Sequence, residues 1–107
     1  MSGKRYLNLV GPQIRKLRYQ KGWSQNALAT RLQLAGLDKD RTAVGKIESR
    51  LVHVSDYQLL YLSEVFGVGL VDLYPRWNPE KSVKDVVPDL MERRVWRNAV
   101  QGSKIAS

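Results

Sequence analysis

The sequence predicts a small all-α domain. Five short segments carry apolar residues at helical spacing, and links of a few residues separate them. Residues suited to helix capping stand just before several of these segments. The β-branched run "LVHV" at 51–54 has no partner run elsewhere and is expected to be an irregular connection. This pattern favours a compact helical fold followed by a C-terminal extension.

The first two helices are marked by their ends. The first is predicted at 12–21, because Pro12 suits a first helical position and Gly22 is a natural stop. Ser24 is a typical N-cap, so the second helix is predicted to follow it at 25–35.

The third helix is predicted at 41–49, after the polar link 37–40. Asp40, or otherwise Asp38, is expected to cap it. On a helical wheel, Val44, Ile47 and Leu51 fall on one side and are expected to anchor the helix. The opposite face carries Arg41, Thr42, Gly45, Lys46 and Ser49. Because glycine costs about 1 kcal/mol in a helix interior relative to alanine, Gly45 suggests close approach of another surface.

The fourth helix is predicted at 56–66, where Ser55 and Gln58 form a capping box. A short fifth helix is predicted at 70–74, and Pro75 ends it.

The segment 76–107 differs in character. A linker punctuated by prolines leads to an amphipathic pattern at 88–101, with a stripe of Met91, Val95 and Ala99. One interpretation is a partly disordered basic tail. The other is a helix that packs on a partner protomer.

The net charge of +8 is confined to one half of the chain. Residues 1–50 hold 11 Lys and Arg against 3 Asp and Glu, whereas residues 51–107 hold 7 of each. A one-sided excess of this kind indicates a surface that meets a polyanion, with nucleic acid first and anionic lipid second. The absence of cysteine excludes disulfides and thiolate zinc sites and agrees with a cytoplasmic location. Neither a signal peptide nor a membrane span is expected.

Few residues suit catalysis or metal binding. The chain has one histidine, no Gly-rich phosphate loop and no paired carboxylates. We therefore expect no enzyme activity, no metal site and no cofactor. His53 is expected to be an exposed loop histidine or, alternatively, a neighbour of phosphate or backbone.

Four motifs together resemble a known family. They are "IRKLR" at 14–18, "GWSQNALA" at 22–29, "KIE" at 46–48 and L-x-x-L-S-x-x-F-G-V-x-L-x-x-L at 59–73. The chain resembles the Cro and lambda-repressor-like (XRE-type) helix-turn-helix domain over about 12–75. The resemblance implies a five-helix fold within 1–75, with the third helix in the major groove of DNA.

The resemblance also implies roles for particular residues. Base-edge contacts are expected from Arg41, Thr42, Gly45 and Lys46. Phosphate contacts are expected from Gln25, Asn26, Lys39, Ser49 and Arg50. Arg18 and Glu48 match the pair that ties the first helix to the third. Such a domain implies a transcriptional regulator, a repressor or autoregulator, that binds a near-palindromic operator in double-stranded DNA as a homodimer.

Two features depart from the family pattern. The turn at 33–40 is longer than in many members, which bears on the tilt of the third helix and on where the second helix ends. Arg50 stands where a helix-ending glycine is common, and a left-handed conformation there would be costly. We expect its charge to serve a phosphate instead.

Two other functions fit part of this pattern. An antitoxin or adaptor would hold a protein partner through 76–107, with DNA secondary. RNA binding is less favoured, because single-strand readers stack bases on exposed aromatic residues, and most aromatic residues here stand at core spacings or in the tail.

Overall fold

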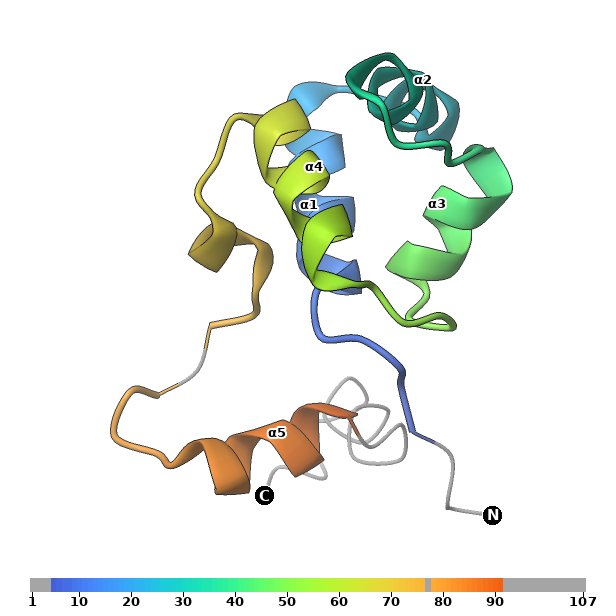
Figure 1. Ribbon diagram of the computed structural model, residues 1–107. Coiled ribbons are helices and arrows are strands. Elements are labelled where there is room, and N and C mark those ends of the chain that lie inside the picture. Colours follow the sequence, from blue (N-terminus) through green and yellow to red (C-terminus); the bar gives the residue numbers. More distant parts are fainter. Residues whose placement is uncertain (1–4, 77, 92–107) are drawn as a thin grey trace.

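The computed structural model describes residues 5–76 and 78–91. These residues form five α-helices and one 3₁₀ helix and contain no β-strand, so the predicted all-α class is confirmed (Figure 1). In chain order the elements are α1 (Gly11–Lys21), α2 (Gln25–Ala35), α3 (Arg41–Glu48), α4 (Asp56–Phe66), η1 (Leu70–Leu73) and α5 (Val83–Met91). In the described part of the chain, no helix combines the length and apolar character needed to cross a membrane.

The predicted caps begin three of the helices. The Ser24 hydroxyl and the Asp40 carboxylate each accept a hydrogen bond from the backbone N–H three residues later, at 3.0 and 2.8 Å. Ser55 and Gln58 form the expected reciprocal capping box at the start of α4. These bonds satisfy N–H groups that have no partner within the helix, which is why the helices begin where the sequence predicted.

The long link between α2 and α3 is closed by its own hydrogen bonds. Gly36 ends α2 in the left-handed conformation with φ of 114°. The Leu37 N–H donates to the Leu32 carbonyl at 2.8 Å, and the Gln33 side chain donates to the Lys39 carbonyl at 2.8 Å. Helix α2 therefore ends at Ala35, as predicted, and gains no extra turn.

One hydrophobic core lies between α1, α2, α3, α4 and η1. The Trp23 ring stacks on Phe66 with centroids 5.7 Å apart, and the Arg31 guanidinium lies 4.2 Å from the centroid of the Trp23 ring. Full burial of a side chain such as Phe66 contributes about 1.5–3 kcal/mol. The buried hydrophobic residues of this core are Val10, Ile14, Leu17, Leu28, Ala29, Leu32, Leu37, Val44, Ile47, Leu62, Phe66 and Leu73.

The end of α3 differs from the prediction. The helix ends at Glu48, and Arg50 adopts the left-handed conformation with φ of 66°. Because the helix has ended, residues after this turn no longer fall on the helix face that Val44 and Ile47 share. Leu51 is therefore 48% exposed, and its expected role as an anchor of α3 is wrong.

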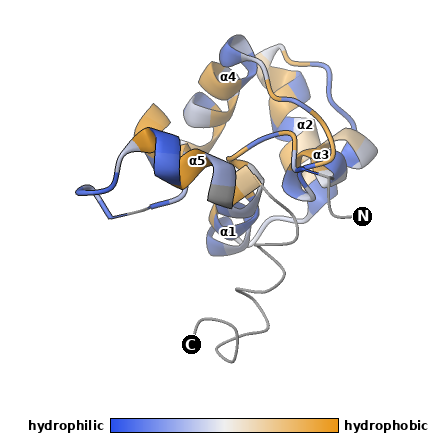
Figure 2. Ribbon diagram, turned by 90° about the horizontal axis from the view of Figure 1, so that it is seen from below, coloured by the Kyte–Doolittle hydropathy of each residue, from blue (hydrophilic) through white to orange (hydrophobic). Residues whose placement is uncertain are grey.

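The C-terminal helix begins earlier than predicted. Helix α5 starts at Val83 rather than near 88, because Ser82 precedes it and accepts the Lys84 N–H at its hydroxyl. Pro88, expected at the start, lies inside the helix and has no N–H to donate. Hydrophobic and hydrophilic residues alternate along its ribbon (Figure 2). Val95 and Ala99, the other two residues of the predicted stripe, lie outside the described residues.

Candidate nucleic-acid interface

Helix α3 is anchored by one face and exposes the other. Val44 is 1% exposed and Ile47 is 3% exposed, and Glu48 beside them is also buried. The predicted outer face is solvent-accessible: Gly45 is partly exposed, and the exposed residues are Arg41, Thr42, Lys46 and Ser49. In Figure 1 this helix lies at one side of the molecule, next to α2. The separation into two faces predicted from the helical wheel is therefore confirmed.

A buried ion pair fixes α3 to α1. The Arg18 Nε–H donates to Glu48 Oε2 at 2.6 Å, and a terminal Arg18 N–H donates to Glu48 Oε1 at 3.0 Å. The other terminal nitrogen of Arg18 donates to the Trp23 carbonyl at 2.8 Å. The hydrogen bond to Glu48 raises the pKa of the Arg18 guanidinium. The pair expected between these residues is thus present, and it has the two-pronged geometry that arginine favours with carboxylates.

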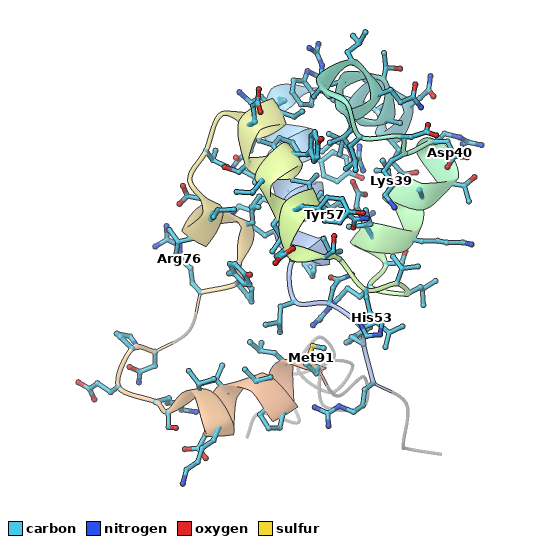
Figure 3. The ribbon with its side chains drawn as sticks, viewed as in Figure 1. Lys39, Asp40, His53, Tyr57, Arg76 and Met91 are labelled. Atoms are coloured by element: carbon cyan, nitrogen blue, oxygen red, sulfur yellow. The ribbon has the colours of Figure 1, made fainter. Side chains whose placement is uncertain are left out.

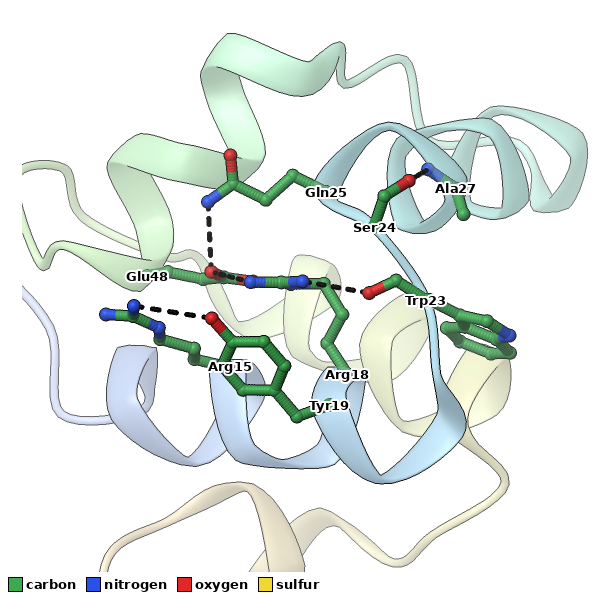
Figure 4. Close-up of polar contacts among 8 residues, drawn as sticks. All are labelled: Arg15, Arg18, Tyr19, Trp23, Ser24, Gln25, Ala27 and Glu48. Carbon is green, nitrogen blue, oxygen red and sulfur yellow. Dashed lines mark hydrogen bonds and ion pairs between the residues drawn. The ribbon is translucent and has the colours of Figure 1, made fainter.

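Gln25 extends this pair to the start of α2 (Figure 4). Its side-chain nitrogen donates to Glu48 Oε1 at 3.1 Å, so one carboxylate joins α1, α2 and α3. One N–H of the Gln25 side-chain amide is therefore used inside the protein, and only its second N–H could donate to a phosphate. In the first turn of α2 the Ser24 hydroxyl already accepts the Ala27 N–H. The backbone N–H groups of Gln25 and Asn26 have no acceptor within the helix, so they can contribute to binding an anion.

Gly45 packs against the same glutamine. A Cβ built on Gly45 would lie 3.5 Å from Gln25 Oε1, which is ordinary van der Waals contact. The fold itself would therefore accept alanine at this position. The described intramolecular contacts give no reason for a glycine at this position.

A shallow hollow lies beside α3. Its volume is about 290 Å³, and its polar lining consists of Lys39, Thr42, Lys46 and His53 together with the Asp40 carboxylate. His53 is exposed, as expected for a loop histidine, but only the fold shows that it shares a hollow with two lysines. Figure 3 labels Lys39, Asp40 and His53 on the side of the molecule where α3 lies. A hollow lined by several cationic or hydrogen-bonding groups suits a phosphate.

The remaining residues expected at phosphates divide into two groups. Asn26 and Ser49 are exposed, and Ser49 directly follows α3. Arg50 is 4% exposed, and its guanidinium donates to the carbonyl oxygens of Asn8 and Leu90. Burial lowers the pKa of this guanidinium. The prediction that Arg50 contacts phosphate is therefore corrected, because its side chain is turned into the protein.

Helix α1 adds a contact between Arg15 and Tyr19 that was not predicted from the sequence. Arg15 donates to the Tyr19 hydroxyl at 3.4 Å, and this hydrogen bond lowers the pKa of Tyr19. The Arg18 guanidinium also lies 4.7 Å from the centroid of the Tyr19 ring. Figure 4 shows Arg15 and Tyr19 beside the pair of Arg18 and Glu48. The only sequence signal for this arrangement is the spacing of four residues between Arg15 and Tyr19.

The described residues contain no group of three or more His, Cys, Asp or Glu side chains that could hold a metal ion. Comparison of the chain with protein-family models, with curated proteins and with solved structures found no significant match.

Proposed function

We propose that this protein is a sequence-specific double-stranded DNA-binding transcriptional regulator with a Cro and lambda-repressor-like helix-turn-helix domain. The observation that carries the proposal is the outer face of α3, where Arg41, Thr42 and Lys46 are exposed while Val44 and Ile47 anchor the opposite face. The major groove admits an α-helix, and guanidinium and ammonium groups bind guanine O6 and N7. A threonine methyl meets the thymine methyl, and its hydroxyl meets phosphate.

The surrounding charge supports the same proposal. Of the Lys and Arg residues in the first half of the chain, Arg18 and Arg50 are buried and spend their hydrogen bonds inside the protein. The described cations of this half that remain accessible are Arg5, Arg15, Lys16, Lys21, Arg31, Lys39, Arg41 and Lys46. Cations of this kind bind phosphates without reading sequence, and they make the affinity depend on salt.

The network at Glu48 supplies the rigidity that base reading needs. Arg18 and Gln25 hold this carboxylate from α1 and α2, one turn along α3 from Gly45. A helix held in this way presents its outer side chains at a fixed orientation. Helix α3 therefore cannot tilt to make good contacts with a wrong base. As a homodimer, the protein would read two half-sites centred about 34–36 Å apart, one turn of DNA.

The experiment that tests this function selects bound sites from random duplex DNA and measures salt dependence on the selected site. We expect one preferred, near-palindromic sequence. Arg41→Ala and Lys46→Ala should each relax the preference at one or two base pairs and cost about 1–3 kcal/mol on the selected site.

Arg76→Ala is the matched control, because Arg76 is also exposed but lies outside the cationic half of the chain. It should leave base preference unchanged. If wild-type protein selects no sequence, the proposed function is wrong. If Arg41→Ala weakens every sequence equally, Arg41 binds phosphate and does not read bases.

Gly45→Ala should separate folding from DNA binding. We expect the free energy of unfolding to rise by up to about 1 kcal/mol, because alanine favours a helix and its methyl group meets only ordinary contacts. Affinity for the selected duplex should fall, since the methyl group would stand between α3 and the bases. Urea unfolding and DNA titration of the same variant measure both effects. Unchanged affinity would remove Gly45 from the interface.

A further inference from the structure

The second residue after α3 is held in a costly backbone conformation. Arg50 has φ of 66°, and it is the one non-glycine residue with positive φ in the described segments. For an L-residue other than glycine, asparagine or aspartate, the left-handed region costs roughly 1–2 kcal/mol. Such a conformation persists only where surrounding contacts stabilise it. The contacts of Arg50 are therefore informative.

These contacts join the end of α3 to the end of α5. The Arg50 Nε–H donates to the Asn8 carbonyl at 2.8 Å, and a terminal N–H donates to the Leu90 carbonyl at 2.7 Å. A contact of 3.8 Å to Met91 Sδ accompanies this bond, and the guanidinium lies 4.0 Å from the centroid of the Tyr6 ring. A cation is favourable there, because the last carbonyl groups of a helix carry partial negative charge.

The N-terminal segment completes the junction. The Tyr6 N–H donates to the Met91 carbonyl at 2.7 Å, and the Leu7 N–H donates to the Arg50 carbonyl at 3.0 Å. Figure 1 shows α5 lying apart from α1 to α4, near this N-terminal segment. The hydrogen bonds described between α5 and the rest of the fold therefore come from the Tyr6 backbone and from Arg50, and the buried Val86 adds apolar packing.

Asn8 fixes the other side of the same turn. Its side-chain nitrogen donates to the carbonyl oxygens of Ile47 at 3.2 Å and Val52 at 2.9 Å, on either side of Arg50. Its side-chain oxygen accepts the Gly11 N–H at 2.8 Å, which ties the turn to the start of α1. The position of α3's last turn therefore depends on the N-terminal segment, which in turn holds α5.

We propose that Arg50 is a positioning residue that couples the docking of α5 to the setting of α3, so that lifting α5 away weakens DNA binding. With α5 displaced, the Arg50 guanidinium loses the Leu90 carbonyl while its backbone remains in the left-handed region. The turn then relaxes, and Ser49 and the last turn of α3 shift with it. This inference rests on the proposed function, because it assigns α5 control over the helix that reads DNA.

Hydrogen exchange of the full-length chain tests the junction without DNA. Arg50→Gly removes the guanidinium while accepting the positive φ, so backbone strain does not obscure the result. We expect amide exchange to become about 5- to 30-fold faster in 83–91, which loses the bond to the Leu90 carbonyl, and in 45–50, which loses the bond to the Asn8 carbonyl. Arg76→Ala, which removes an exposed arginine, should change neither segment.

A second variant approaches the same coupling from α5. Val86 is 6% exposed, and Val86→Asp should displace α5 without altering any residue of α3. Faster exchange at 45–50 in this variant would support the coupling. Faster exchange confined to 83–91 would overturn it, as would wild-type exchange of 83–91 in Arg50→Gly.

DNA binding supplies the final comparison, with the duplex selected by the wild-type protein as the probe. We expect Arg50→Gly and Val86→Asp each to lose about 5-fold or more in affinity, and the duplex to slow exchange of 83–91 in the wild type alone. If the wild type binds this duplex and both variants bind equally well, the inference is wrong and the proposed function stands. If the wild type binds no duplex, the proposed function and the inferred control of DNA binding by α5 are both wrong. This holds even if the exchange data show that Arg50 couples α5 to α3.

Discussion

Replacing Glu48 with glutamine is expected to lower the free energy of unfolding by about 3–5 kcal/mol. Glutamine has the same size, so the change leaves no cavity, but it removes the charge that balances the buried Arg18 guanidinium. In either orientation, the side-chain nitrogen of the new amide would also face an Arg18 N–H, and in one of them the Gln25 donor as well. A small domain is stable by only about 5–15 kcal/mol, so this loss is a large share of the total. Urea unfolding followed by circular dichroism measures it.

Two comparisons make this prediction specific. Glu64→Gln neutralises an exposed glutamate of α4 and should change stability by less than about 0.5 kcal/mol. The double variant Arg18→Met with Glu48→Leu should lose less than Glu48→Gln alone, because it removes both buried charges together. A loss below about 1 kcal/mol for Glu48→Gln would mean that the pair behaves as an exposed one.

Gly11→Ala is expected to cost about 3 kcal/mol of stability, at the upper end for overpacked sites. A Cβ on Gly11 would lie closer to the Ile47 carbonyl oxygen than atoms pack, and it would lie 2.8 Å from both the Glu48 carbonyl oxygen and Arg50 Cγ. Two of these three atoms belong to the backbone, so relief requires the last turn of α3 to move away from α1. The effect exceeds the helix-forming advantage of alanine over glycine.

Gly69→Ala is the matched control for this variant. The nearest atom to a Cβ at Gly69 is Asp72 Oδ2 at 3.5 Å, and the φ of Gly69 is −76°, which alanine adopts readily. Thermal unfolding of both variants is the measurement. Equal melting temperatures for Gly11→Ala and the wild type would show that α1 and α3 approach less closely than described.

Local features of the fold were predictable because their causes are local. Ser24, Asp40 and Ser55 cap helices through bonds to N–H groups three residues away, so a short window of sequence contains both partners. The faces of α3 follow in the same way from the helical period, which places Val44 and Ile47 together. The start of α5 was missed because Pro88 looked like a first residue, whereas Ser82 provides the actual cap.

The candidate site was predictable only in part. The exposure of Arg41, Thr42 and Lys46 followed from helical phase, and their contact with bases stays a prediction. The pair of Arg18 and Glu48 spans 30 residues, and it was expected through the family resemblance rather than through periodicity. The bond from Gln25 to Glu48 and the position of His53 on the hollow had no signal in the pattern.

By itself, the sequence determined the helices, their caps and the outward face of α3, because hydrogen bonds and side-chain phase over a few residues decide these features. Only the tertiary structure decided what Arg50 does. As one basic residue in a basic half-chain it was expected to face a phosphate, yet its partners Asn8 and Leu90 lie 42 and 40 residues away. A buried guanidinium needs carbonyl acceptors to offset its lost hydration, and only the folded chain brings those acceptors together.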